Sequence, residues 1–68
     1  MKSAELLRKL KKLAGKRAQR FRTEPGKGSH LHVWVGPHRT VVPLHGAELP
    51  TGTLAKILKD LNIEKEEI

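Results

Sequence analysis

The sequence predicts a small α+β domain in which two helices pack on one face of a three-stranded antiparallel sheet. One segment near each end of the chain carries leucine or isoleucine at the i, i+3, i+4 spacing of an amphipathic helix. The stretch between them alternates β-branched with polar residues, which is the period of a strand. A chain of 68 residues suffices for one domain, so residues 1–68 are expected to fold as a single unit.

The first helix is expected over residues 3–14. Ser3 is a candidate N-cap, and Glu5 in the first turn complements the positive end of the helix dipole. Gly15 is expected to end the helix, because glycine tolerates the left-handed cap conformation. The buried stripe of this helix is Leu6, Leu7, Leu10 and Leu13.

Three strands are expected next, over residues 17–23, 30–35 and 39–44. The strand over residues 17–23 is predicted from only a weak alternation of residue types. "EPGKGS" is expected to be a loop, because proline restricts φ and the glycines free it. "GPH" is short enough to make the second and third strands a hairpin, and Pro43 indicates an edge position or the end of its strand.

The second helix is expected over residues 54–61, with Thr53 as its N-cap and Asn62 as its stop. "HGAELPTG" before it is expected to be a loop, and the charged residues after it are expected to fray. The buried stripe of this helix is Leu54, Ile57, Leu58 and Leu61.

The strand over residues 30–35 separates its side chains into two sets. Leu31, Val33 and Val35 are expected to face the helices, because they are the apolar set. The other set, which is expected to face away from the helices, is His30, His32 and Trp34.

The composition indicates which kinds of molecule the protein can bind. Fourteen lysines and arginines against seven acidic residues give a net charge of +7, which attracts phosphate polymers and acidic protein surfaces. Solubility alone is the alternative reason for such charge. There is no cysteine, no apolar run long enough to span a bilayer and no signal-peptide pattern, so we expect a cytoplasmic protein without a membrane association.

His30 is the first candidate for chemistry. Imidazole titrates near neutrality and can take or give a proton in a transition state. Gly28 and Ser29 before it allow close approach of backbone amides to a phosphate, and Lys27 can offset negative charge on a phosphorane. RNA supplies its own nucleophile, the 2′-hydroxyl. A plain surface histidine is the alternative.

The other polar residues carry weaker signals. His30 and His32 share a face and could chelate a metal ion, with further ligands from His38, His45 or a carboxylate. No further ligand stands at a characteristic spacing, so no metal site is expected. Trp34 can stack a base, contact a partner protein or join the core, and Arg39 can contact phosphate or remain solvated.

Several segments in order resemble the HicA family of toxins from type II toxin–antitoxin systems. They are "MKSAELLRKL", "GKGSH" and "RTVVPLHGAELPTGTLAKILKDLNI", and together they cover nearly the whole chain. The resemblance implies a fold like the double-stranded-RNA-binding domain, with the order α-β-β-β-α. It also implies a metal-independent mRNA interferase without a cofactor, whose catalytic histidine falls on His30, with Gly28 and Ser29 completing the motif.

The resemblance further implies a HicB-type antitoxin that covers the active face. Two features depart from the family. Many members read "GSHH.F", whereas the second histidine here is His32, so no role is carried onto it. The segment over residues 15–24 is also more basic than usual. Two further hypotheses stay open: a non-catalytic RNA-binding module of the same fold, and a bare protein-interaction subunit. No small-molecule substrate is expected.

Overall fold

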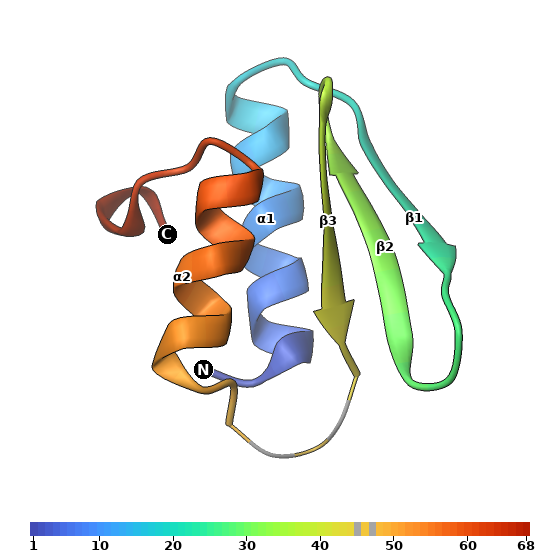
Figure 1. Ribbon diagram of the computed structural model, residues 1–68. Helices are drawn as coiled ribbons and strands as arrows, with labels where there is room; N and C mark the ends of the chain where they lie inside the picture. Colours follow the sequence, from blue (N-terminus) through green and yellow to red (C-terminus); the bar gives the residue numbers. More distant parts are fainter. Residues whose placement is uncertain (45, 47) are drawn as a thin grey trace.

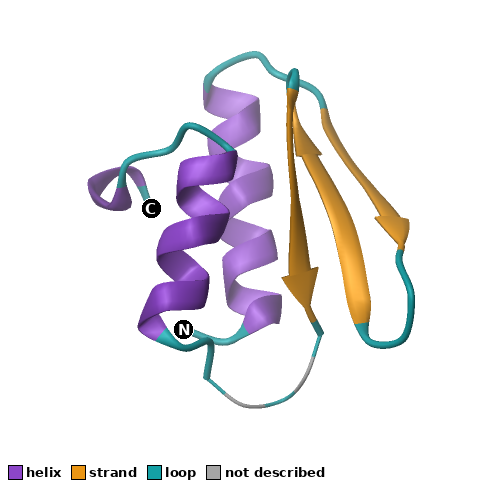
Figure 2. Ribbon diagram, viewed as in Figure 1, coloured by secondary structure: helices purple, strands orange, loops and turns teal. Residues whose placement is uncertain are grey.

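The computed structural model describes residues 1–44, 46 and 48–68. Both helices lie on the same side of an antiparallel sheet whose strand order is β1-β2-β3 (Figures 1 and 2). This arrangement confirms the predicted α+β class and the order α-β-β-β-α. The elements are α1 (Ser3–Lys16), β1 (Phe21–Pro25), β2 (His30–Val35), β3 (His38–Pro43), α2 (Thr51–Asp60) and a short 3-10 helix, η1 (Lys65–Glu67).

Helix α1 differs from its predicted ends. Lys2 is the N-cap, and Ser3 is buried inside the first turn instead of capping it. The helix continues through Gly15 to Lys16 instead of ending at Gly15, and Ala14 belongs to its buried face. The left-handed residue is Ala18, with φ of 55°. Its N–H donates to the Gly15 carbonyl (3.2 Å) while the Gln19 N–H donates to Ala14 (2.9 Å), which is the Schellman pattern.

Strand β1 occupies Phe21–Pro25, so the prediction of a strand over residues 17–23 was wrong in its position. The helix cap uses residues 17–19, and pairing with β2 sets the rest: Phe21 lies opposite Val35 and Pro25 lies opposite Leu31. Pro25 was expected in a loop. It is tolerated at the end of β1 because β1 is an edge strand, where a missing N–H costs little.

The β2–β3 hairpin agrees closely with the prediction. β2 has its predicted bounds, and β3 begins one residue early because Gly36 and Pro37 alone make the turn. Gly36 has φ of +58°, which suits the first central position of a type II′ turn. Pro43 is the last residue of β3 in an edge strand, as predicted.

The core lies between the sheet and the two helices. Val33 and Val35 of β2 are fully buried, and Leu31 packs against the same cluster, which confirms the predicted inward set. The helices contribute their predicted stripes, with Leu7 and Leu54 only partly buried. The buried cluster comprises Leu6, Leu10, Leu13, Ala14, Val33, Val35, Val42, Leu49, Ile57, Leu58, Leu61 and Ile63.

Helix α2 begins earlier than predicted. Pro50 is its N-cap, and Thr53 lies inside the helix, because proline's restricted φ suits a helix start. Asn62 ends the helix as predicted, with φ of 57° and a second Schellman pattern in which the Ile63 N–H donates to Leu58 (2.9 Å).

The C-terminal residues do not fray as expected. Glu64 and Glu67 form a capping box around η1, and Glu67 forms an ion pair with Arg17. Ile68 packs against the core.

In the part of the chain that the structure describes, no helix is both long enough and apolar enough to cross a bilayer.

Gly36→Ala should destabilise the protein by about 1–3 kcal/mol. Alanine at this position would have to adopt a positive φ, and its Cβ would lie 2.8 Å from Gln19 Nε2. Gly15→Ala is the matched control, because a Cβ there meets nothing within 4 Å and alanine favours a helix by about 0.5–1 kcal/mol. Urea unfolding measures both. Equal effects of the two substitutions would contradict the account of the turn.

Asp60→Asn should lower the melting temperature at neutral pH but not in strong acid. Hydrogen bonds from Lys56 and from the buried Thr40 hydroxyl hold the pKa of Asp60 below its ordinary value of 3.8. A lowered carboxyl pKa stabilises the fold above 3.8, and this stabilisation is lost as pH falls through the folded-state value. Melting curves of both proteins against pH test this; a difference that persists at the lowest pH would refute it.

Candidate active site

The side of the sheet that faces away from the helices gathers most of the polar residues that the sequence singled out. Alternation along β2 places His30, His32 and Trp34 there, as predicted. We call this surface the outer sheet face. Strand register adds residues from both neighbouring strands, so its members are Arg22, Glu24, His30, His32, Trp34, Arg39, Val41 and Pro43.

The loop over residues 26–29 connects β1 to β2 and delivers His30 to the end of the outer sheet face. The Gly26 N–H donates to the His30 carbonyl (2.8 Å), and the His30 N–H donates to the Lys27 carbonyl (3.3 Å). Gly28 has φ of +63°, a conformation that strains residues with a side chain. The loop therefore depends on glycine at this position, immediately before Ser29 and His30.

The His30 ring is oriented by the same loop. Its Nδ1 lies 3.0 Å from the Lys27 carbonyl oxygen, and the side chain is exposed. A carbonyl only accepts, so Nδ1 carries the proton of this hydrogen bond. The neutral ring then has its lone pair on Nε2, where it can act as a base. Lys27 thus contacts His30 through its carbonyl.

His32 has the opposite tautomer. Its Nδ1 lies 3.3 Å from Arg39 Nη1, and because a guanidinium only donates, Nδ1 accepts and Nε2 carries the proton. The Nε2 edge of the ring lies against the loop, since a Cβ added to Gly26 would lie 3.2 Å from it. His32 is therefore held between Arg39 and the loop that carries His30.

Trp34 lies on the outer sheet face and is not part of the buried core cluster, so of the three alternatives for Trp34 the structure excludes membership of the core. Arg22 places its guanidinium carbon 4.0 Å from the indole centroid, and the His32 ring centroid lies 6.1 Å away. Arg22 Nη1 also donates to Glu24 (2.7 Å). Sequence reasoning missed Arg22 and Glu24; the alternation of Phe21 and Thr23 with them would have revealed both.

The remaining candidates lie elsewhere. His38 pairs with Val35 and belongs to the helix-facing side of the sheet. His45 lies outside the described residues. Among residues 1–44, 46 and 48–68, no three His, Asp or Glu side chains gather in a way that could hold a metal ion.

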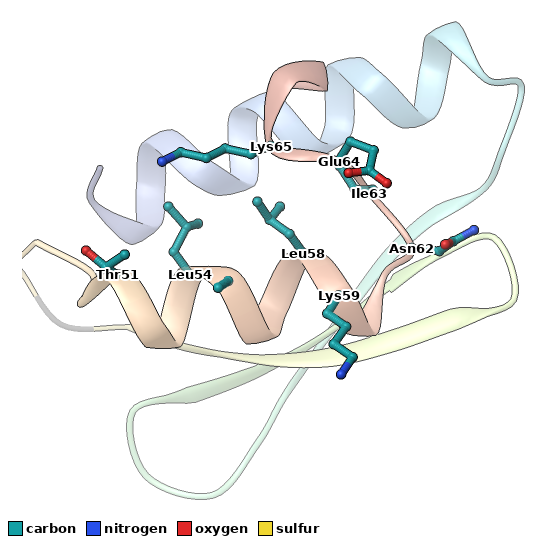
Figure 3. A pocket seen from close by; sticks show the side chains of 9 residues that line it. Thr51, Leu54, Leu58, Lys59, Asn62, Ile63, Glu64 and Lys65 are labelled. Carbon is teal, nitrogen blue, oxygen red and sulfur yellow. The ribbon is translucent and has the colours of Figure 1, made fainter.

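A groove of about 360 Å³ lies between α2 and the segment that follows it, on the helical side of the molecule (Figure 3). Leu54, Leu58 and Ile63 give it an apolar floor, and Lys59, Asn62, Glu64 and Lys65 surround them. None of its lining residues belongs to the outer sheet face. The groove is therefore separate from the candidate active site.

Comparison with known protein families supports the resemblance read from the motifs. A family model described as the HicA toxin of bacterial toxin–antitoxin systems matches residues 3–63. Neither the curated proteins nor the solved structures include a significant match. The matched segment contains both α-helices, all three strands and the loop that carries His30. The chain therefore belongs to the HicA toxin family of bacterial toxin–antitoxin systems.

Proposed function

We propose that this HicA-family chain is a metal-independent endoribonuclease, an mRNA interferase that inhibits translation and growth and uses His30 as its catalytic residue. The observation that carries the proposal is the hydrogen bond from His30 Nδ1 to the Lys27 carbonyl. It orients the ring and leaves the Nε2 lone pair as a base on an exposed, positively charged surface. Family membership supports the choice of RNA and of the cytoplasm as the place of action.

The reaction follows from the chemistry of RNA. Nε2 of His30 takes the proton of a 2′-hydroxyl, and the 2′-oxygen attacks the adjacent phosphorus. The bond from phosphorus to the 5′-oxygen breaks, so the products are a 2′,3′-cyclic phosphate and a new 5′-hydroxyl. The Lys27 carbonyl stabilises the imidazolium through Nδ1–H as it forms, because it accepts a hydrogen bond from a charged ring.

Charge on the phosphorane is offset by the loop before His30. The Lys27 ammonium and the amides of Gly28 and Ser29 are the nearest candidates in the chain. His32 is the candidate for the acid that protonates the leaving 5′-oxygen. It would act as the imidazolium, which returns to the neutral ring when it gives up its proton, and it lies two residues along β2, roughly 6–7 Å from His30.

The partner that restrains this activity is proposed to be a HicB-type antitoxin that covers the outer sheet face. Membership of a toxin–antitoxin family supports an antitoxin of this kind. The net charge of +7 favours an acidic partner surface, and rim charges of opposite sign accelerate association.

His30→Ala should reduce RNA cleavage at least about 100-fold, because general acid–base catalysis contributes roughly 10²–10⁴ in rate. The measurement is cleavage of a labelled single-stranded RNA in excess EDTA, with circular dichroism to verify folding. His38→Ala is the control, because His38 belongs to the opposite side of the sheet. Equal cleavage by wild type and His30→Ala, or no cleavage by either, would refute the catalytic role.

Expression in bacteria separates the proposed enzyme from a non-catalytic RNA-binding module. Wild-type protein should arrest growth, whereas His30→Ala should not, because binding surface remains but the base is gone. Co-expression of a HicB-type antitoxin encoded beside the toxin should restore growth of the wild type. Arrest by both proteins would favour the binding module.

A further inference from the structure

The outer sheet face carries a second organised group at the end of β2 opposite to His30. We propose that Trp34, with Arg22 and Arg39 on either side, forms a platform on which an unpaired base of the RNA stacks. The platform would make the protein bind single-stranded RNA in preference to duplex RNA. This inference rests on the proposed function for its substrate class.

The platform is a row across all three strands. Arg22 of β1 lies opposite Trp34 of β2, and Trp34 lies opposite Arg39 of β3. Because β2 is the central strand (Figure 1), Trp34 lies between Arg22 and Arg39 in this row of paired residues. The Arg22 guanidinium carbon lies 4.0 Å from the indole centroid, well within the reach of a cation–π contact.

Both arginines are already held in the free protein. Arg22 donates to Glu24 at 2.7 Å, and Arg39 donates to His32 at 3.3 Å. Side chains that are held beforehand lose less freedom when a ligand binds. The Arg22 side chain nevertheless keeps 49% of its surface exposed, so a base has access to it. Glu24 offsets the Arg22 charge, which makes this end a weaker phosphate site than the loop at Lys27.

A nucleobase fits these groups better than other ligands do. Every base has a π-face, and unpaired bases stack on aromatic rings and on guanidinium planes. An A-form duplex hides those faces within its own stack. Trp34 lies four residues along β2 from His30, roughly 13 Å away, so the stacked base belongs to a nucleotide outside the cleaved bond. The platform would therefore act on substrate binding more than on the chemical step.

The chain offers a direct probe, because Trp34 is its only tryptophan and it has no tyrosine. The His30→Ala protein is titrated with a short single-stranded oligoribonucleotide, with the same strand made abasic, and with a blunt duplex. Intrinsic fluorescence should be quenched strongly by the first ligand and little by the other two. Equal quenching by all three would overturn the proposal. The proposal would also be overturned if the anisotropy of the labelled oligoribonucleotide showed saturated binding while the fluorescence of Trp34 was not quenched.

Substitutions give an independent readout in the active enzyme. Trp34→Ala should raise KM for single-stranded RNA roughly 5- to 150-fold, with a smaller change in kcat, and Trp34→Phe should restore part of it. Arg22→Lys keeps the charge but loses the guanidinium plane, so it should also raise KM. Arg8→Lys on the exposed surface of α1 is the charge-matched control and should have no effect. Equal KM values for the Arg22 and Arg8 variants would overturn the role of Arg22.

The two proposals fail separately. If wild type cleaves RNA and His30→Ala binds it without quenching, the platform is wrong and the enzyme stands. If single-stranded RNA quenches Trp34 but wild type does not cleave, the platform stands and the catalytic proposal is wrong.

Discussion

The rest of this structure depends on the pairing register of the central strand β2. Val33 and Val35 are completely buried against the helices, and each valine contributes roughly 1.5–3 kcal/mol by leaving water. A shift of one residue would bury His32 and Trp34 and expose the valines. The burial that stabilises this small domain therefore also holds the histidines and the tryptophan on the opposite side.

The two edge strands, β1 and β3, place further side chains beside those of β2 on the outer sheet face. Register with β1 brings Arg22 beside Trp34 and Glu24 beside His32, while register with β3 brings Arg39 beside Trp34. Arg39 in turn sets the tautomer of His32, and the loop carbonyl of Lys27 sets that of His30. Two histidines on one face thus hold opposite neutral tautomers, with the lone pair on Nε2 of His30 and on Nδ1 of His32.

Much of the fold and part of the candidate site could be predicted from local pattern. The strand over residues 30–35 was predicted with its bounds because its alternation is strict, and Asn62 was predicted as a stop because asparagine tolerates positive φ. The ends of α1 and the position of β1 could not be predicted. Gly15 favours a helix stop, but the left-handed residue is Ala18, and the Schellman hydrogen bonds of Ala18 and Gln19 end the helix after Lys16 instead.

The sequence by itself determined the class of the fold, the two faces of β2 and the motif that resembles HicA toxins, because period and spacing are properties of neighbouring residues. Only the tertiary structure decided which side chains meet across strands. Arg22 on Trp34, Arg39 on His32 and the Lys27 carbonyl on His30 depend on strand register and on the shape of one loop. Those contacts orient the groups that we propose to act on RNA.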